Sequence, residues 1–167
     1  MNQRTRTILM WALYALLYLL VMLVQTTLFG RMRLFGVKVN LMPIVIACIA
    51  MQVEHESAGL FGLIAGFVWY ACGSDDGALA MVSYTVLAIL CAWISDNFLA
   101  KRFLSAFLLC LAAVVFHESA RFLLKYYLGD APGRLLIWVP VISGLSLVPS
   151  PIIYLLSKII RKAGADA

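Results

Sequence analysis

Residues 8–28 form an uncharged run of 21 residues close to the amino terminus. A single helix needs about 20 consecutive apolar residues to cross the hydrocarbon core of a bilayer. The run is too long for the apolar part of a signal peptide, which has about 7–15 residues, and it lacks a small-x-small cleavage site. We therefore expect residues 8–28 to form a retained transmembrane helix.

Further apolar runs with few charges follow this one, separated by short polar segments: 39–53, 57–72, 78–94, 103–128 and 135–160. Charged residues make up only 13% of the 167 residues, against roughly 25% in soluble domains. A chain of this size has too much surface to hide the excess of apolar residues from water. The sequence predicts an all-α integral membrane protein, a single polytopic domain over residues 1–167 with six transmembrane helices in a compact bundle.

Two of the predicted helices, 39–53 and 57–72, are short. At a rise of 1.5 Å per residue they reach about 23–24 Å, less than the roughly 30 Å of a bilayer core. They either span a thinned region or form a helical hairpin that neighbouring helices partly bury, and we expect two spans. The last run contains Pro140, Pro149 and Pro151, which predict a kink.

Basic residues outnumber acidic ones by 13 to 8, a net charge of +5, but they are spread along the chain. We therefore expect contact with membrane lipid and no nucleic-acid partner. Basic residues at the span ends are more numerous on the side of the two termini than on the other side, although the first loop is basic as well. Because cytoplasmic loops are enriched in Lys and Arg, both termini are predicted to be cytoplasmic.

The third run contains a ridge of small residues, Ala58, Gly62 and Gly66, at intervals of four. This spacing places them on one helix face and lets another helix approach closely. The partner is either a helix of this chain, which we favour, or a helix of another protein.

The fifth run contains His117, Glu118 and Arg121, whose spacing allows them to share one face of a helix. Ionisable residues at membrane depth usually face the protein interior or a cavity. The cluster is therefore either an interfacial ion pair or a binding site.

Motifs of known catalytic or metal-binding function are missing from the sequence, including H-E-x-x-H and G-x-S-x-G. The four cysteines have no C-x-x-C spacing and lie in apolar runs, so small buried side chains explain them better than metal ligands. We expect no catalytic residue, no cofactor and no metal.

Several short motifs occur in an order typical of one bacterial family. The first apolar run ends near Gln25, a short basic loop follows, and Asn40 and Leu41 open the second run. A glycine-rich third helix and a late proline-bearing helix before a basic tail complete the set. In this order, over nearly the whole chain, the sequence resembles the MreD family of rod shape-determining proteins. Two positions depart from the family pattern, because Val39 replaces a proline and Tyr70 replaces an aspartate.

The resemblance implies a non-enzymatic subunit of the cell-elongation complex in the bacterial inner membrane, supporting synthesis of the lateral cell wall. Its implied partners are the single-span protein MreC and, in the same complex, MreB, RodA and an elongation-specific transpeptidase. It also implies a fold similar to the S-components of vitamin transporters, and a small-molecule-binding transporter subunit is the alternative function. A lipid-modifying enzyme that uses Glu118 or Asp75 is a third, weaker possibility.

Overall fold

The computed structural model describes residues 3–29, 39–73, 78–97, 103–128 and 139–166. Within these ranges every regular element is a helix and no strand occurs, which confirms the predicted all-α class. The elements are α1 (Gln3–Val24), a π-helical turn η1 (Gln25–Phe29), α2 (Met42–Ala50), α3 (His55–Ala71), α4 (Leu79–Asn97), α5 (Phe103–Tyr127), α6 (Val139–Ser146) and α7 (Ser150–Asp166). The first basic loop, Asp75, Asp76, Lys101, Arg102 and Arg134 lie outside the described residues.

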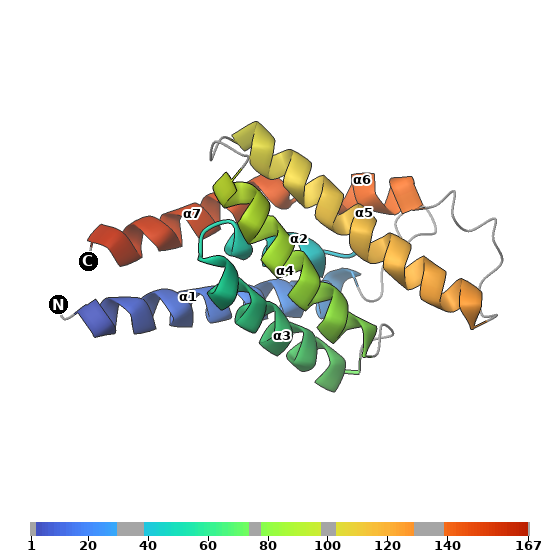
Figure 1. Ribbon diagram of the computed structural model, residues 1–167, viewed down its shortest axis with the longest axis horizontal. Coiled ribbons are helices and arrows are strands. Elements are labelled where there is room, and N and C mark those ends of the chain that lie inside the picture. The colour runs from blue at the N-terminus through green and yellow to red at the C-terminus, as the bar shows by residue number, and fades with distance from the viewer. Residues whose placement is uncertain (1–2, 30–38, 74–77, 98–102, 129–138, 167) are drawn as a thin grey trace.

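Successive segments run in alternating directions, so the two ends of the chain lie at the same end of the molecule (Figure 1). Helices α1 and α7 contact each other along one edge, and α3 packs along α4 on another. Helix α5 lies against both α4 and α2. The resulting bundle surrounds α2, which occupies the centre of the view (Figure 1).

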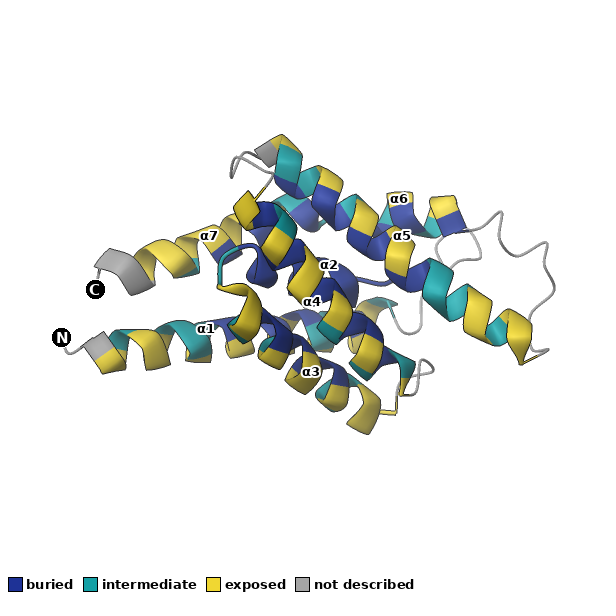
Figure 2. Cartoon of the chain, viewed as in Figure 1, coloured by how far each residue is buried: buried dark blue, intermediate teal, exposed yellow. Residues whose placement is uncertain are grey.

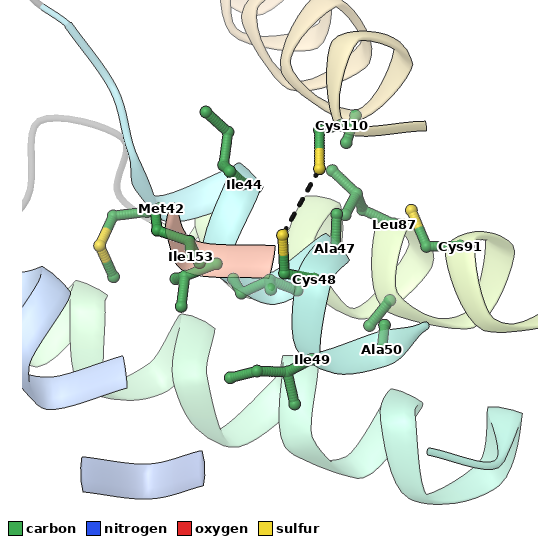
Figure 3. Close-up of a cluster of buried hydrophobic side chains, with 14 of the residues drawn as sticks. Met42, Ile44, Ala47, Cys48, Ile49, Ala50, Leu87, Cys91, Cys110 and Ile153 are labelled. Carbon is green, nitrogen blue, oxygen red and sulfur yellow. Dashed lines mark hydrogen bonds between the residues drawn. The ribbon is translucent and has the colours of Figure 1, made fainter. Parts of the chain in front are cut away.

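Helix α2 is the core of the bundle rather than one of its outer helices. All nine of its residues are buried, and it contacts α1, α3, α4, α5 and α7 (Figure 2). Figure 3 shows Ile44, Cys48 and Ile49 of α2 pointing toward different neighbours. The helix is apolar on every side because every side meets protein, which is the expected pattern for a fully buried helix.

The second predicted span is therefore shorter than its apolar run, because α2 begins at Met42 and ends at Ala50. Nine residues extend only about 14 Å, less than half of a bilayer core. Pro43 occupies the first turn, where its missing N–H costs no helical hydrogen bond. A turn stabilised by hydrogen bonds from Gln52 N to Ile49 O and from Val53 N to Ala50 O ends the helix.

Three helices are long and apolar enough to cross a membrane within the described residues, over Arg4–Phe29, Leu79–Asn97 and Leu104–Tyr127. The number rises to four if α6 and α7, bent by 49° at their junction, count as one broken span. The expectation of six spans is not met by length and composition, because α2 and α3 are too short. Helix α3 has 17 residues and ends at Ala71. Gly73 follows its C-cap residue Cys72, and the positive φ of 76° at Gly73 suits a residue without a Cβ.

The predicted kink in the last run is a complete break between α6 and α7. Pro149 and Pro151 stand at its carboxyl side and have no backbone N–H to continue the helix. Turn-type bonds from Val148 N to Leu145 O and from Ser150 N to Leu147 O fill the gap.

The outer surface of the bundle exposes large apolar side chains over most of its length. Leu16 and Leu23 on α1, Leu104 on α5 and Ile152 on α7 are each at least 60% exposed. A continuous apolar surface of this kind is unstable in water and typical of contact with lipid.

Candidate functional site: a buried polar cluster

Gln25 fixes the segment that enters α2. Its Nε2 donates to Val39 O at 2.7 Å, and its Oε1 accepts from Leu41 N at 3.0 Å. The side-chain amide thereby pairs with the backbone on both sides of Asn40, as a neighbouring β-strand would. Gln25 is the first residue of η1, and π-helical turns are frequent where a side chain has a specific task.

Asn40 connects three parts of the fold at the entry of α2. Its Oδ1 accepts from Met42 N at 3.2 Å, which satisfies one of the free N–H groups of the first helical turn. Its backbone N donates to Ser146 Oγ at 3.1 Å, and its Nδ2 donates to Glu118 Oε1 at 3.1 Å. The residue therefore joins α2 to the end of α6 and to the middle of α5.

Glu118 is only 4% exposed. Arg121, one turn further along the same helix, compensates its negative charge. Arg121 Nη1 lies 3.8 Å from Glu118 Oε2, and the Arg121 side chain is 21% exposed. The pair thus joins a buried acid to a partly exposed base. A buried carboxylate needs this kind of pairing, because desolvation of an unpaired charge is very costly.

His117, the neighbour of Glu118 in sequence, faces α4 instead of α2. Its Nδ1 lies 3.0 Å from Ser83 Oγ, and its ring centre lies 4.9 Å from that of Tyr84 at an interplanar angle of 35°. His117 is completely buried. Two adjacent residues of α5 therefore contact different elements. His117 contacts α4, and Glu118 contacts the entry of α2.

We call this set the polar cluster. It consists of Gln25, Asn40, Ser83, His117, Glu118, Arg121 and Ser146. The structure thus brings together two groups of residues that were predicted independently. The first group is Gln25, Asn40 and Leu41, and the second is His117, Glu118 and Arg121. Leu41 takes part through its backbone N–H. Sequence reasoning missed Ser83, Tyr84 and Ser146; hydroxyl groups inside apolar helices were the available signal, but nothing in their spacing indicated their partners.

The small-residue ridge lies against α4, so the structure places a helix of this chain on it. A Cβ at Gly62 would lie 2.6 Å from Tyr84 O, and one at Gly66 would lie 2.6 Å from Met81 Cα. Ala58 is completely buried. On the other side of α3, Tyr18 Oη donates to Ala65 O at 2.6 Å, a contact that the small side chain of Ala65 leaves open.

Other features of the described residues lie apart from the polar cluster. An open groove of about 380 Å³ between α3 and α4 is lined by Leu63, Ala78, Met81, Val82, Thr85 and Val86, none of which belongs to the cluster. Cys48 Sγ lies 3.5 Å from Cys110 Sγ (Figure 3). Cys72 is exposed, unlike the other three cysteines, because it follows the last turn of α3. No group of three His, Cys, Asp or Glu residues within the described part could hold a metal ion.

These features define a class of helical protein. Its described part has three or four helices that are long and apolar enough to cross a membrane, and its interior polar residues bond to one another around a short buried helix. Beyond this class the comparisons give no family, since no protein-family model matches the sequence, and no curated protein and no solved structure matches it.

Proposed function

We propose that this protein is a non-enzymatic, multi-pass subunit of the cell-elongation complex in the bacterial inner membrane. In this proposal both termini are cytoplasmic, and the bundle binds the transmembrane helix of MreC and supports synthesis of the lateral cell wall. MreB, RodA and the elongation transpeptidase are partners within the same complex. Six segments enter or cross the membrane, with α2 enclosed by the others in an arrangement similar to transporter S-components.

The observation that carries the proposal is the position of the residues on which the resemblance to the MreD family depends. Gln25, Asn40 and Leu41 form one hydrogen-bonded junction that holds the entry of α2 against α5. Residues from separate short motifs therefore contribute to the same structural junction. The junction gives a physical reason for these residue types at these positions, since a backbone segment entering a buried helix needs internal hydrogen-bond partners.

The contacts of the polar cluster favour a structural role over catalysis. Glu118 is engaged by Asn40 and Arg121, and His117 by Ser83. A general acid or base must reach a substrate proton within hydrogen-bond distance, and Glu118 and His117 are both buried. The groove between α3 and α4 has an almost entirely apolar lining, which suits a lipid chain or a helix better than a polar vitamin.

The test is co-purification from native membranes. The protein, tagged at its own chromosomal locus, is extracted in mild detergent, and the proteins recovered with it are identified by mass spectrometry. Recovery of MreC, together with rounding of the cells when the protein is depleted, is the expected result. Cells that stay rod-shaped after a clean deletion, with no second copy of the gene, would overturn the proposal.

The same preparation tests the transporter alternative. A small molecule retained through purification at about one per chain, with an energy-coupling transporter subunit in place of MreC, would replace our proposal by the S-component function. Loss of cell shape on Glu118→Gln substitution with MreC binding and protein abundance unchanged would instead indicate an enzyme.

A further inference from the structure

A group of basic side chains marks the end of the molecule where both termini lie. These residues are Arg4, Arg6, Lys158, Arg161 and Lys162. They come from α1 and α7, which contact each other along one edge of the bundle (Figure 1). Arg4, Lys158 and Lys162 are exposed. We call the neighbouring surfaces of α1 and α7, with these bases, the α1–α7 edge.

The acidic side chains described at this end belong to other elements. Glu54 and Glu56 precede and open α3, and Asp96 lies in the last turn of α4. Arg161 is directed toward the turn between α2 and α3, since its Nη1 donates to Gln52 Oε1 at 3.3 Å. The exposed positive charge on the α1–α7 edge is therefore carried by Arg4, Lys158, Arg161 and Lys162, of which Arg161 is directed toward Gln52.

The distance along α7 from its bend to its bases matches one leaflet of a bilayer. Ile152, Leu155 and Ile159 are 64%, 53% and 60% exposed and form an apolar face that leads to Lys162. The ten steps along the helix from Ile152 to Lys162 rise about 15 Å, half of the roughly 30 Å hydrocarbon core. An acyl chain along this face would place its phosphate at the level of the bases.

Helix α1 has the same order of residues from the same end. Arg4 is exposed, and Ile8 and Leu16, further along the helix, are 69% and 60% exposed. Two neighbouring helices thus offer an apolar face with bases at one end, and basic sites of this kind at the cytoplasmic ends of helices suit anionic head groups.

We propose that the α1–α7 edge binds an anionic phospholipid of the inner leaflet, with the phosphate held by Arg4, Lys158 and Lys162 and the acyl chains along α7. The proposal rests on the membrane insertion contained in the proposed function but not on the role in cell elongation. Failure to recover MreC would leave it intact.

The experiment is a lipid titration of the purified full-length protein. Phosphatidylglycerol or phosphatidylcholine is added to the protein in mild detergent, and bound lipids are counted by native mass spectrometry. The wild-type protein should bind phosphatidylglycerol more tightly than phosphatidylcholine. Each base near a membrane surface contributes about fivefold, so the triple variant Arg4→Gln, Lys158→Gln, Lys162→Gln should lose on the order of 100-fold of the affinity for phosphatidylglycerol.

Two controls separate site binding from general charge. Lys162→Gln and Lys125→Gln remove the same charge, but Lys125 lies near the far end of α5, so only Lys162→Gln should weaken binding. Lys158→Arg with Lys162→Arg keeps the charge and should retain the preference. Equal binding of the two lipids by the wild-type protein, or undiminished phosphatidylglycerol binding by the triple variant, would overturn the proposal.

Discussion

The amide Nδ2 of Asn40 lies 3.1 Å from Glu118 Oε1, although 78 residues separate the two in the chain. The bond joins the irregular entry of the buried helix α2 to the middle of α5. Since Asn40 also bonds Met42 N and Ser146 Oγ, Glu118 fixes a residue on which three elements depend. Its contribution should therefore appear in the stability of the whole bundle.

Replacement of Glu118 by leucine should destabilise the fold more than replacement by glutamine. Leucine removes the acceptor of Asn40 Nδ2 and the partner of Arg121, and a buried donor without an acceptor costs about 1–3 kcal/mol. Glutamine keeps the Oε1 acceptor and should stay closer to the wild type. The free energy of unfolding, measured by SDS titration in mixed micelles, tests this order. Equal stability of Glu118→Leu and Glu118→Gln would show that the Asn40 bond contributes nothing.

Replacement of Gln25 by methionine should also destabilise the bundle, by about 1–3 kcal/mol, because two buried backbone groups lose their partners. The matched control is Thr27→Val in the same π-helical turn. Thr27 is exposed, and its Oγ1 donates to Leu23 O of the preceding turn, so the change should stay within about 0.5 kcal/mol. The same unfolding titration measures both variants. Similar effects at the two positions would contradict a stabilising role of the hydrogen bonds of Gln25 with Val39 O and Leu41 N.

Alanine at Gly62 or Gly66 should destabilise the contact of α3 with α4. The added Cβ would lie 2.6 Å from backbone atoms of α4 at either site, so the helices must separate, at a typical overpacking cost of about 1–3 kcal/mol. Gly144→Ala in α6 is the control, because among the described residues no atom beyond its chain neighbours and the backbone of its own helix lies within 4 Å of its Cβ position. There the better helix propensity of alanine should leave stability unchanged or raise it by about 0.5–1 kcal/mol. Thermal unfolding in detergent measures the stability of each variant. If both α3 variants were as stable as the wild-type protein, the close approach of α3 to α4 would be contradicted.

Cys72 should be the cysteine labelled by a membrane-impermeant maleimide. It is exposed, whereas Cys48, Cys91 and Cys110 are buried, and α3 carries it away from the end of the molecule that holds both termini (Figure 1). With cytoplasmic termini, labelling should occur in intact spheroplasts and disappear in the Cys72→Ser variant. Labelling confined to inside-out vesicles would reverse the orientation and place both termini outside.

The helical regions could be predicted from the sequence with useful accuracy. Apolar runs between polar segments predicted helices at 78–94 and 103–128, close to α4 (Leu79–Asn97) and α5 (Phe103–Tyr127). Pro149 and Pro151 predicted a kink in the last run, since proline removes a helical donor, and the structure has a complete break there. Ionisable residues in α5 indicated either an interfacial ion pair or a binding site, and the structure buries two of them, His117 and Glu118.

The membrane-crossing count and the composition of the polar cluster depended on tertiary structure. In a membrane, side chains that face lipid and side chains that face protein are both apolar, so hydropathy does not distinguish an outer helix from an enclosed one. For this reason the run 39–53 suggested a span, although α2 is enclosed on every side. In the same way, spacing within α3 identified Gly62 and Gly66 as a packing face but not α4 as the helix that meets it.

By itself, the sequence determined which segments become helices and that most of the surface is apolar, because helix formation and hydrophobicity are properties of short stretches of chain. Only the tertiary structure decided that Gln25, Asn40, Ser146 and Glu118 meet around the entry of α2. Their hydrogen bonds join residues up to 106 positions apart, and such pairings are set by the way the helices pack rather than by any local pattern.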